Sequence, residues 1–213
     1  MSWIDSFFQS EGWLNGHRAI SRDDRAVEDT HNLIALLDLQ PGTNVLDVPC
    51  GFGRIALPLA AAGMQVTGVD ITQPMLLEAQ EKAEKRGLAI NWERRDMRDL
   101  PWVEHFDVAL NIWGSFGYFD DNGDAAFAAG VRRSLRAGGR FIIDVPSLEG
   151  LAGTWQPRGW FDAGGTKMLE ERVYHPLTGR IHTTWTFIRD GIATTHESDM
   201  RIYSAVELAN LLR

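Results

Sequence analysis

The sequence predicts an α/β fold: a doubly wound, mostly parallel sheet with helices on both faces, and an antiparallel β meander inserted after the fifth strand. Short apolar and β-branched runs alternate with helix-length segments from residue 23 to residue 146, which is the pattern of parallel β-α-β crossovers. After Pro146 the helical segments give way to consecutive β-rich runs separated by short turns. The 213 residues are enough for one compact domain.

Five strands and four helices are expected before Pro146. Apolar residues recur at helical spacing from residue 23 to residue 39, and a Pro–Gly pair ends that segment. A second clear helix opens at Pro74 and stops at Gly87. The other helices are expected at 54–62 and 121–135, and the strands at "NVLDV", "QVTGVD", "AINWERRDM", "FDVALNIW" and "GRFIIDVP".

The β-rich region is expected to form three antiparallel strands, "KMLEERVYHP", "RIHTTWTFIR" and "ATTHESDMRIY". A loop rich in glycine and tryptophan, residues 147–165, precedes them. Two histidines of these strands, His182 and His196, are interpreted as lying on one polar, solvent-facing side. Ser204 with Glu207 three residues later has the spacing of a capping box, so a helix should begin there.

Composition argues against several classes of partner. The formal net charge is -8 and no basic stripe is present, so a nucleic-acid partner is not expected. No apolar run approaches the roughly 18 residues of a membrane span, so no membrane partner is expected either. The single cysteine excludes an intrachain disulfide, and we expect a reducing, cytoplasmic location. No cluster of ligands at metal spacing is found, and the oligomeric state stays open.

A glycine-rich loop, "DVPCGFGR", lies between the first expected strand and the helix after it. Residues 51–56 match G-x-G-x-x-A, and Asp70 lies near the distance at which a Rossmann-like dinucleotide site keeps its ribose-binding acid. Asp47 ends the strand before the loop, where its charge would repel a pyrophosphate. A carboxylate there favours a cation, and S-adenosylmethionine carries an α-ammonium and a sulfonium together with a ribose diol for Asp70.

The motifs resemble those of the class I S-adenosylmethionine-dependent methyltransferases, small-molecule type. "VLDVPCGFGR" resembles the first motif of that family with Pro49 in place of the usual first glycine, and "VTGVDIT" resembles the second. "RRDMRDLP", "NIWGSFGYF" and "LRAGGRFIIDVP" resemble the following segments in order. The resemblance implies one Rossmann-like methyltransferase domain, divided into an N-terminal cap segment (1–22), a cofactor-binding core (23–146), a loop and antiparallel lobe covering the active site (147–203), and the start of a helix (204–213).

The resemblance also implies a set of site residues. Asp96 would meet the adenine amino group and the Met97 backbone N–H the ring edge. The whole set expected to bind S-adenosyl-L-methionine is Asp47, Pro49, Cys50, Gly51, Gly53, Arg54, Asp70, Ile71, Asp96, Met97, Asn111, Trp113 and Ser115. Cys50 is interpreted as a small buried residue of the loop, because no histidine lies near it in sequence.

Methyl transfer from a sulfonium is an in-line displacement, so alignment and exclusion of water matter most, and a base matters only for a protonated acceptor. Tyr118 and His17 are the candidate catalytic residues, with His17 expected in an exposed turn before the helix at 23–39. The acceptor is expected to be a small molecule, with nitrogen favoured slightly over oxygen. Its predicted contacts are Phe116, Tyr118, Arg201 and Tyr203.

Two other functions compete with this interpretation. An NAD(P)-dependent Rossmann oxidoreductase would explain the glycine pattern but not Asp47. A non-catalytic S-adenosylmethionine-binding protein would keep the motifs without turnover, and the absence from the sequence of the two final strands usual in the family leaves that reading open.

Overall fold

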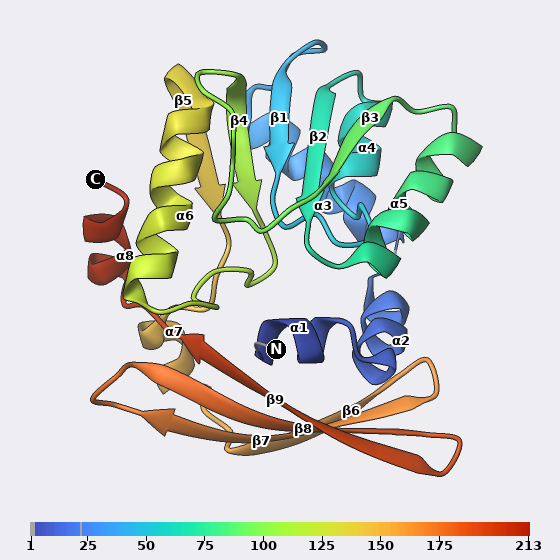
Figure 1. Ribbon diagram of the computed structural model, residues 1–213, viewed down its shortest axis with the longest axis vertical. Helices are drawn as coiled ribbons and strands as arrows, with labels where there is room; N and C mark the ends of the chain where they lie inside the picture. The colour runs from blue at the N-terminus through green and yellow to red at the C-terminus, as the bar shows by residue number, and fades with distance from the viewer. Residues whose placement is uncertain (1–2, 22) are drawn as a thin grey trace. The chain divides into compact units, whose positions relative to one another are not determined.

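The computed structural model describes residues 3–21 and 23–213, and it divides the chain into two compact units. We call them the core unit (residues 21–115 and 126–144) and the meander unit (residues 1–20, 116–125 and 145–213). Both units are drawn in Figure 1. No helix in the described ranges has the length and apolar character needed to cross a bilayer.

The core unit contains a five-stranded parallel sheet in the order β3-β2-β1-β4-β5. Its strands are β1 (Asn44–Asp47), β2 (Gln65–Asp70), β3 (Ile90–Arg94), β4 (Phe106–Asn111) and β5 (Leu135–Ile143). The helices are α3 (Asp23–Leu37), α4 (Ala56–Ala61), α5 (Gln73–Lys85) and α6 (Asp121–Ser134), of which α6 begins in the meander unit. Figure 1 shows α3 and α4 behind the sheet and α6 in front. The predicted doubly wound sheet with helices on both faces is confirmed.

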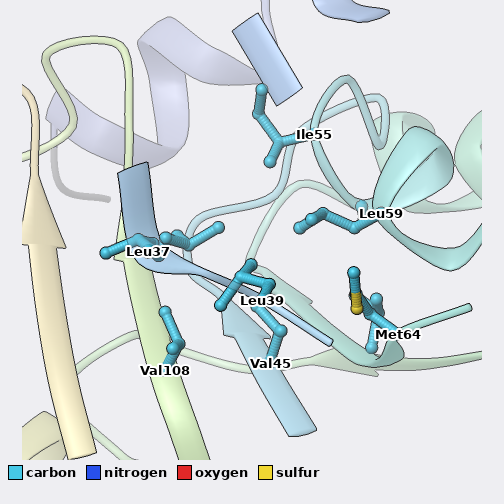
Figure 2. Close-up of a cluster of buried hydrophobic side chains, with 10 residues drawn as sticks. Leu37, Leu39, Val45, Ile55, Leu59, Met64 and Val108 are labelled. Atoms are coloured by element: carbon cyan, nitrogen blue, oxygen red, sulfur yellow. The ribbon is translucent and has the colours of Figure 1, made fainter. Parts of the chain in front are cut away.

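The main hydrophobic cluster fills the space between α3, α4 and the central strands (Figure 2). Val45 and Val108 come from adjacent strands and Leu59 from α4, and all three side chains are completely buried. Strands of a parallel sheet are covered on both faces, which explains why almost every residue of β1, β2 and β4 is buried. This packing fixes the carboxyl ends of these strands next to one another.

The meander unit is built on a four-stranded antiparallel sheet in the order β6-β7-β8-β9. Its strands are β6 (Arg158–Ala163), β7 (Thr166–His175), β8 (Arg180–Arg189) and β9 (Ile192–Arg201). Helices α1 (Trp3–Phe8) and α2 (Glu11–Ile20) pack on one face through Phe7, Met168 and Phe187, and the unit also contains α7 (Leu148–Ala152) and α8 (Ala205–Leu211). The predicted meander after β5 is confirmed, and α8 has the predicted capping box.

Two local predictions were wrong. The segment 147–165 is not a continuous loop, because it contains α7 and the edge strand β6. His17 does not lie in a turn before the first helix, because residues 11–20 form α2. Gly12 and Gly16 weaken the helical signal of this segment but are needed for packing, since a Cβ on them would lie 2.5 Å from Phe187 and 2.4 Å from Met168.

The packing predicts a clear difference between two leucines of the core unit. Leu59→Ala removes a fully buried side chain and should lower the free energy of unfolding by about 2–5 kcal/mol. Leu77→Ala, on the exposed side of α5, should change it by no more than about 0.5 kcal/mol. Urea denaturation of both variants measures the difference, and equal losses would contradict the assignment of the core.

Candidate functional site

Two acidic side chains end neighbouring strands of the core unit. Asp47 is the last residue of β1 and Asp70 the last of β2, and the two strands pair in parallel with Asp47 opposite Gly68. Asp47 is 2% exposed and Asp70 5% exposed. Ligands of open α/β sheets bind at the carboxyl ends of strands, where the sequence placed these acids. Two carboxylates buried this deeply require compensating partners or a ligand.

The glycine-rich loop supplies part of that compensation to Asp70. The backbone N–H of Gly51 donates to Oδ2 of Asp70 over 2.8 Å, and the N–H of Thr72 donates to Oδ1 over 2.7 Å. Gly51 and Gly53 adopt φ values of 53° and 76°, a left-handed conformation that glycine accepts without strain. The loop therefore turns back over the end of β2 and holds the Asp70 carboxylate in one orientation.

Asp47 is compensated less well. Burial raises the pKa of its carboxyl to about 7 and the nearby Asp70 adds to the rise, while the backbone of Ala56 and the charge of Arg54 oppose it. Among the described residues, its Oδ2 atom is buried without a hydrogen-bond partner. Burial also raises the pKa of Asp70, against the effect of hydrogen bonds from Thr72, Gly51 and Ile71. The two carboxylates therefore favour the binding of a cationic ligand.

Asn111, the last residue of β4, is hydrogen-bonded to the segments that follow β1 and β4. Its Nδ2 donates to the carbonyl of Val48 over 2.8 Å and to that of Ser115 over 3.1 Å. The Ser115 hydroxyl in turn donates to the carbonyl of Ile112. The Oδ1 atom of Asn111 is buried and has no hydrogen-bond partner within the described part of the chain. Asn111 thus presents a second acceptor atom near the end of β1.

Arg54 follows the glycine-rich loop and is surrounded by two groups of the core unit. It forms an ion pair with Asp29 of α3, and its guanidinium carbon lies 4.6 Å from the centroid of the Trp113 ring. Trp113 has a φ of 74°, which is a rare conformation for a bulky residue. Its backbone N–H donates to the Asp144 carboxylate. Sequence reasoning missed Asp29 and Asp144, since no motif marks either residue.

Cys50 and Pro49 complete the loop. The Val48–Pro49 peptide bond is cis. Burial raises the pKa of the Cys50 thiol well above its ordinary value, and the charges of Asp70 and Asp47 raise it further. The thiol therefore stays protonated, which agrees with the interpretation of Cys50 as a small buried residue rather than a nucleophile.

The turn after β3 carries the predicted adenine contacts. Arg98 donates to the Asp96 carboxylate through its backbone N–H, its Nε and its Nη2, and these hydrogen bonds lower the pKa of Asp96. Met97 is buried, and the N–H of Arg95 donates to the carbonyl of Asp70 over 3.0 Å. Asp96 thus lies on a turn that is hydrogen-bonded to the end of β2.

The predicted acceptor and catalytic residues all belong to the meander unit, whereas every predicted cofactor residue belongs to the core unit. The Tyr203 hydroxyl donates to the buried Asp124 over 2.9 Å, and its ring packs against Phe116. Arg201 pairs with Glu207 and lies over the Tyr203 ring. These contacts give Phe116, Arg201 and Tyr203 packing roles in the meander unit, and acceptor binding by them stays a prediction.

The two candidate bases lie in aromatic surroundings. The Tyr118 ring contacts Phe8 and Trp3, with centroid distances of 5.2 and 5.8 Å. His17 stacks on Trp13 at 5.1 Å. His182 and His196 do not share a face: His196 packs near Phe187 on the side covered by the helices, whereas His182 lies on the opposite side near Asp199. The prediction of one polar face for both histidines was wrong.

Metal ligation has no support in the described ranges, 3–21 and 23–213, which contain no group of three or more His, Cys, Asp or Glu side chains able to hold an ion. Within these ranges the site consists of two neighbouring acids, acceptor atoms without a hydrogen-bond partner and a largely buried guanidinium. Such a set suits an organic ligand that carries both a positive charge and hydroxyl groups.

Comparisons with known proteins agree with this description. The sequence pattern of the family described as "Methyltransferase domain" matches residues 45–139. An uncharacterized protein of Mycobacterium tuberculosis is 29% identical over 175 residues, which cover 79% of this chain and 58% of that protein. An S-adenosylmethionine-dependent methyltransferase from Clostridium acetobutylicum superposes with a TM-score of 0.75 at 21% identity, over 98% of this chain and 84% of the other.

A second solved structure has the same fold. It is CalS10 from Micromonospora echinaspora, an amino pentose methyltransferase with S-adenosylmethionine bound, which superposes with a TM-score of 0.69 at 15% identity, over 92% of this chain and 84% of the other. Residues 45–139 thus resemble a methyltransferase domain, and the chain has the fold of S-adenosylmethionine-dependent methyltransferases. It spans only about three-fifths of the length of the mycobacterial relative.

The raised pKa of Asp47 predicts how stability depends on pH. The native state holds a proton that the unfolded chain releases between the ordinary value of 3.8 and about 7, so the contribution of Asp47 to stability is lost as pH rises through this range. Asp47→Asn should therefore raise the free energy of unfolding by about 1–4 kcal/mol at about pH 8 and by less than about 1 kcal/mol at about pH 4.5.

Urea denaturation at the two pH values measures this effect. Asp107→Asn is the matched control, because burial tends to raise the pKa of Asp107 but hydrogen bonds from Asn44 and Arg136 hold it below its ordinary value. That variant should lose stability at the higher pH. An increase for Asp47→Asn that is the same at both pH values would contradict the assignment.

Proposed function

We propose that the chain is an S-adenosylmethionine-dependent methyltransferase that acts on a small molecule. The observation that carries this proposal is the pair of buried carboxylates, Asp47 and Asp70, at the ends of adjacent strands beside a glycine-rich loop. A diphosphate would meet the negative charge of Asp47, whereas a cationic nucleoside would be attracted by it. The geometry therefore favours this cofactor over a nicotinamide dinucleotide.

The residues present fit the cofactor at two ends. Oδ2 of Asp47 and Oδ1 of Asn111, which lack a hydrogen-bond partner in the part of the chain that the structure describes, are acceptors that suit the α-ammonium. The Asp70 carboxylate accepts the backbone N–H groups of Gly51 and Thr72, and its remaining lone pairs suit the ribose hydroxyls. Ile71, Asp96 and Met97, on or beside the ends of β2 and β3, are proposed for the adenine.

When bound, the cofactor supplies a methyl group on a sulfonium, whose thioether is a good leaving group. The chain then has to align the acceptor and exclude water, which together remove much of the barrier of a displacement. Buried Asp47 and Asn111 hold the amino-acid end in a fixed place for this alignment. Tyr118 and His17 remain the candidate bases for an acceptor that arrives protonated.

For the acceptor we propose a nitrogen atom ahead of an oxygen atom. The meander unit collects aromatic rings, among them Trp3, Trp13, Tyr118 and Trp185, and the face of an aromatic ring stabilises a cationic amine. The structural relative CalS10 is an amino pentose methyltransferase, which supports this choice by analogy of fold. Transfer to a panel of small amines and alcohols, followed by mass spectrometry, tests it.

Two ligands separate the roles of the two acids. 5′-Methylthioadenosine has the ribose and adenine of S-adenosylhomocysteine but lacks its amino-acid end. Asp70→Asn should weaken the binding of both ligands by about 10- to 100-fold, because both make the ribose contact. Asp47→Asn should weaken the binding of S-adenosylhomocysteine by a similar factor. It should leave the affinity for 5′-methylthioadenosine within about 3-fold of the wild-type value. Calorimetric titration measures all four affinities.

Asp107→Asn, which changes an acid at the opposite ends of the strands, should leave both affinities unchanged. Binding of NADH by the wild-type protein without binding of S-adenosylhomocysteine would refute the proposed function. Binding without turnover over the whole acceptor panel would favour the non-catalytic alternative.

A further inference from the structure

Three buried polar atoms lack a hydrogen-bond partner near the carboxyl ends of β1 and β4, within the described part of the core unit. They are Oδ2 of Asp47, Oδ1 of Asn111 and Nε of Arg54. The first two are acceptors and the third is a donor. A buried polar atom without a partner costs free energy, so three of them in one region call for a ligand of matching polarity.

Two interactions place these atoms in one region of the core unit. Asn111 is hydrogen-bonded to the carbonyl of Val48, the residue that follows Asp47. Arg54 is close enough to Asp47 for its charge to favour the ionised carboxyl. Acceptors suited to an ammonium therefore lie beside a guanidinium suited to a carboxylate. This arrangement is complementary to the two charges of an α-amino acid zwitterion.

The Arg54–Asp29 ion pair does not use up the guanidinium. The contact with Asp29 is made by Nη2, whereas the Nε–H has no hydrogen-bond partner among the described residues although the Arg54 side chain is only 10% exposed. A guanidinium has five N–H donors in a planar fork, so one edge can bind Asp29 while another binds a second carboxylate. Asp29 thus positions the Arg54 guanidinium without using all of its N–H donors.

Trp113 restricts the guanidinium from a second direction. Its ring lies 4.6 Å from the guanidinium carbon, and its backbone is held at a φ of 74° by the hydrogen bonds that Trp113 and Gly114 donate to Asp144. Such a backbone conformation is strained in a bulky residue, and strain of this kind concentrates at functional sites. Stacking on an aromatic face also keeps the guanidinium plane fixed.

We propose that Arg54 binds the α-carboxylate of the methyl donor, with Asp29 and Trp113 as positioning residues, so that the amino-acid end is bound as a zwitterion between Arg54 and the acceptors of Asp47 and Asn111. This inference rests on the proposed function and adds a residue that discriminates between ligands. A ligand with the ammonium but without the carboxylate leaves the Arg54 Nε–H unpaired and binds more weakly.

The test compares S-adenosylhomocysteine with its decarboxylated analogue, S-adenosyl-3-thiopropylamine, by calorimetric titration. The wild-type protein should bind the carboxylated ligand about 10- to 100-fold more tightly, the range for one hydrogen-bonded charge pair. Arg54→Gln should abolish this preference by weakening S-adenosylhomocysteine alone. Arg54→Lys keeps the charge without the fork and should keep only part of the preference.

Two further variants separate recognition from folding. Asp29→Asn leaves Arg54 in place but removes its ion-pair partner, and it should reduce the preference by a smaller factor than Arg54→Gln. Arg136→Gln removes the ion pair with Asp107 at the opposite ends of the strands and should leave the preference unchanged. Thermal melting followed by circular dichroism shows which variants are folded.

The outcomes distinguish the two proposals. If the wild-type protein binds neither ligand, the proposed function fails. If it binds both equally well, or if folded Arg54→Gln keeps the full preference, the role of Arg54 is refuted while the proposed function stands. The comparison of ligands on the wild-type protein needs no variant, so it decides even if Arg54→Gln fails to fold.

Discussion

The burial of two carboxylates at the ends of neighbouring parallel strands is the constraint on which the rest of the site depends. Asp70 is held by the amides of Gly51 and Thr72, so the glycine-rich loop has to turn back over β2. Asp47 is compensated less well, since its Oδ2 atom is buried without a hydrogen-bond partner among the described residues, and burial raises its pKa to about 7. Burial of the Asp47 carboxylate costs free energy on folding, and a bound cation that pairs with this carboxylate recovers part of that cost.

The surrounding core makes this arrangement stable enough to persist. The apolar cluster between α3, α4 and the central strands fixes the ends of β1, β2 and β4, and Asn111 links the residue after Asp47 to the loop after β4. Arg54 is fixed in the same way by Asp29 and Trp113. The free energy gained by hydrophobic burial thus offsets the cost of burying polar groups that lack a full set of partners among the described residues.

Sequence patterns predicted what depends on local periodicity and on strand ends, including the sheet, the glycine-rich loop, Asp47 and Asp70. They did not predict α2, because Gly12 and Gly16 weaken its local signal and are explained only by close packing. The strand β6 was missed although the two-residue Gly164–Gly165 turn after it is a hairpin signal. The roles of Asp29 and Asp144 depend on contacts across the fold, which no local pattern encodes.

The central claim is that Asp47 must be ionised to hold the cationic end of the ligand. The most direct test is the number of protons released when S-adenosylhomocysteine binds at about pH 6, measured by calorimetry in buffers of different ionisation enthalpy. Because the pKa of Asp47 is about 7 in the protein alone, we predict the release of close to one proton, and none from Asp47→Asn. Binding without proton release by the wild-type protein, or equal release by the variant, would contradict the account.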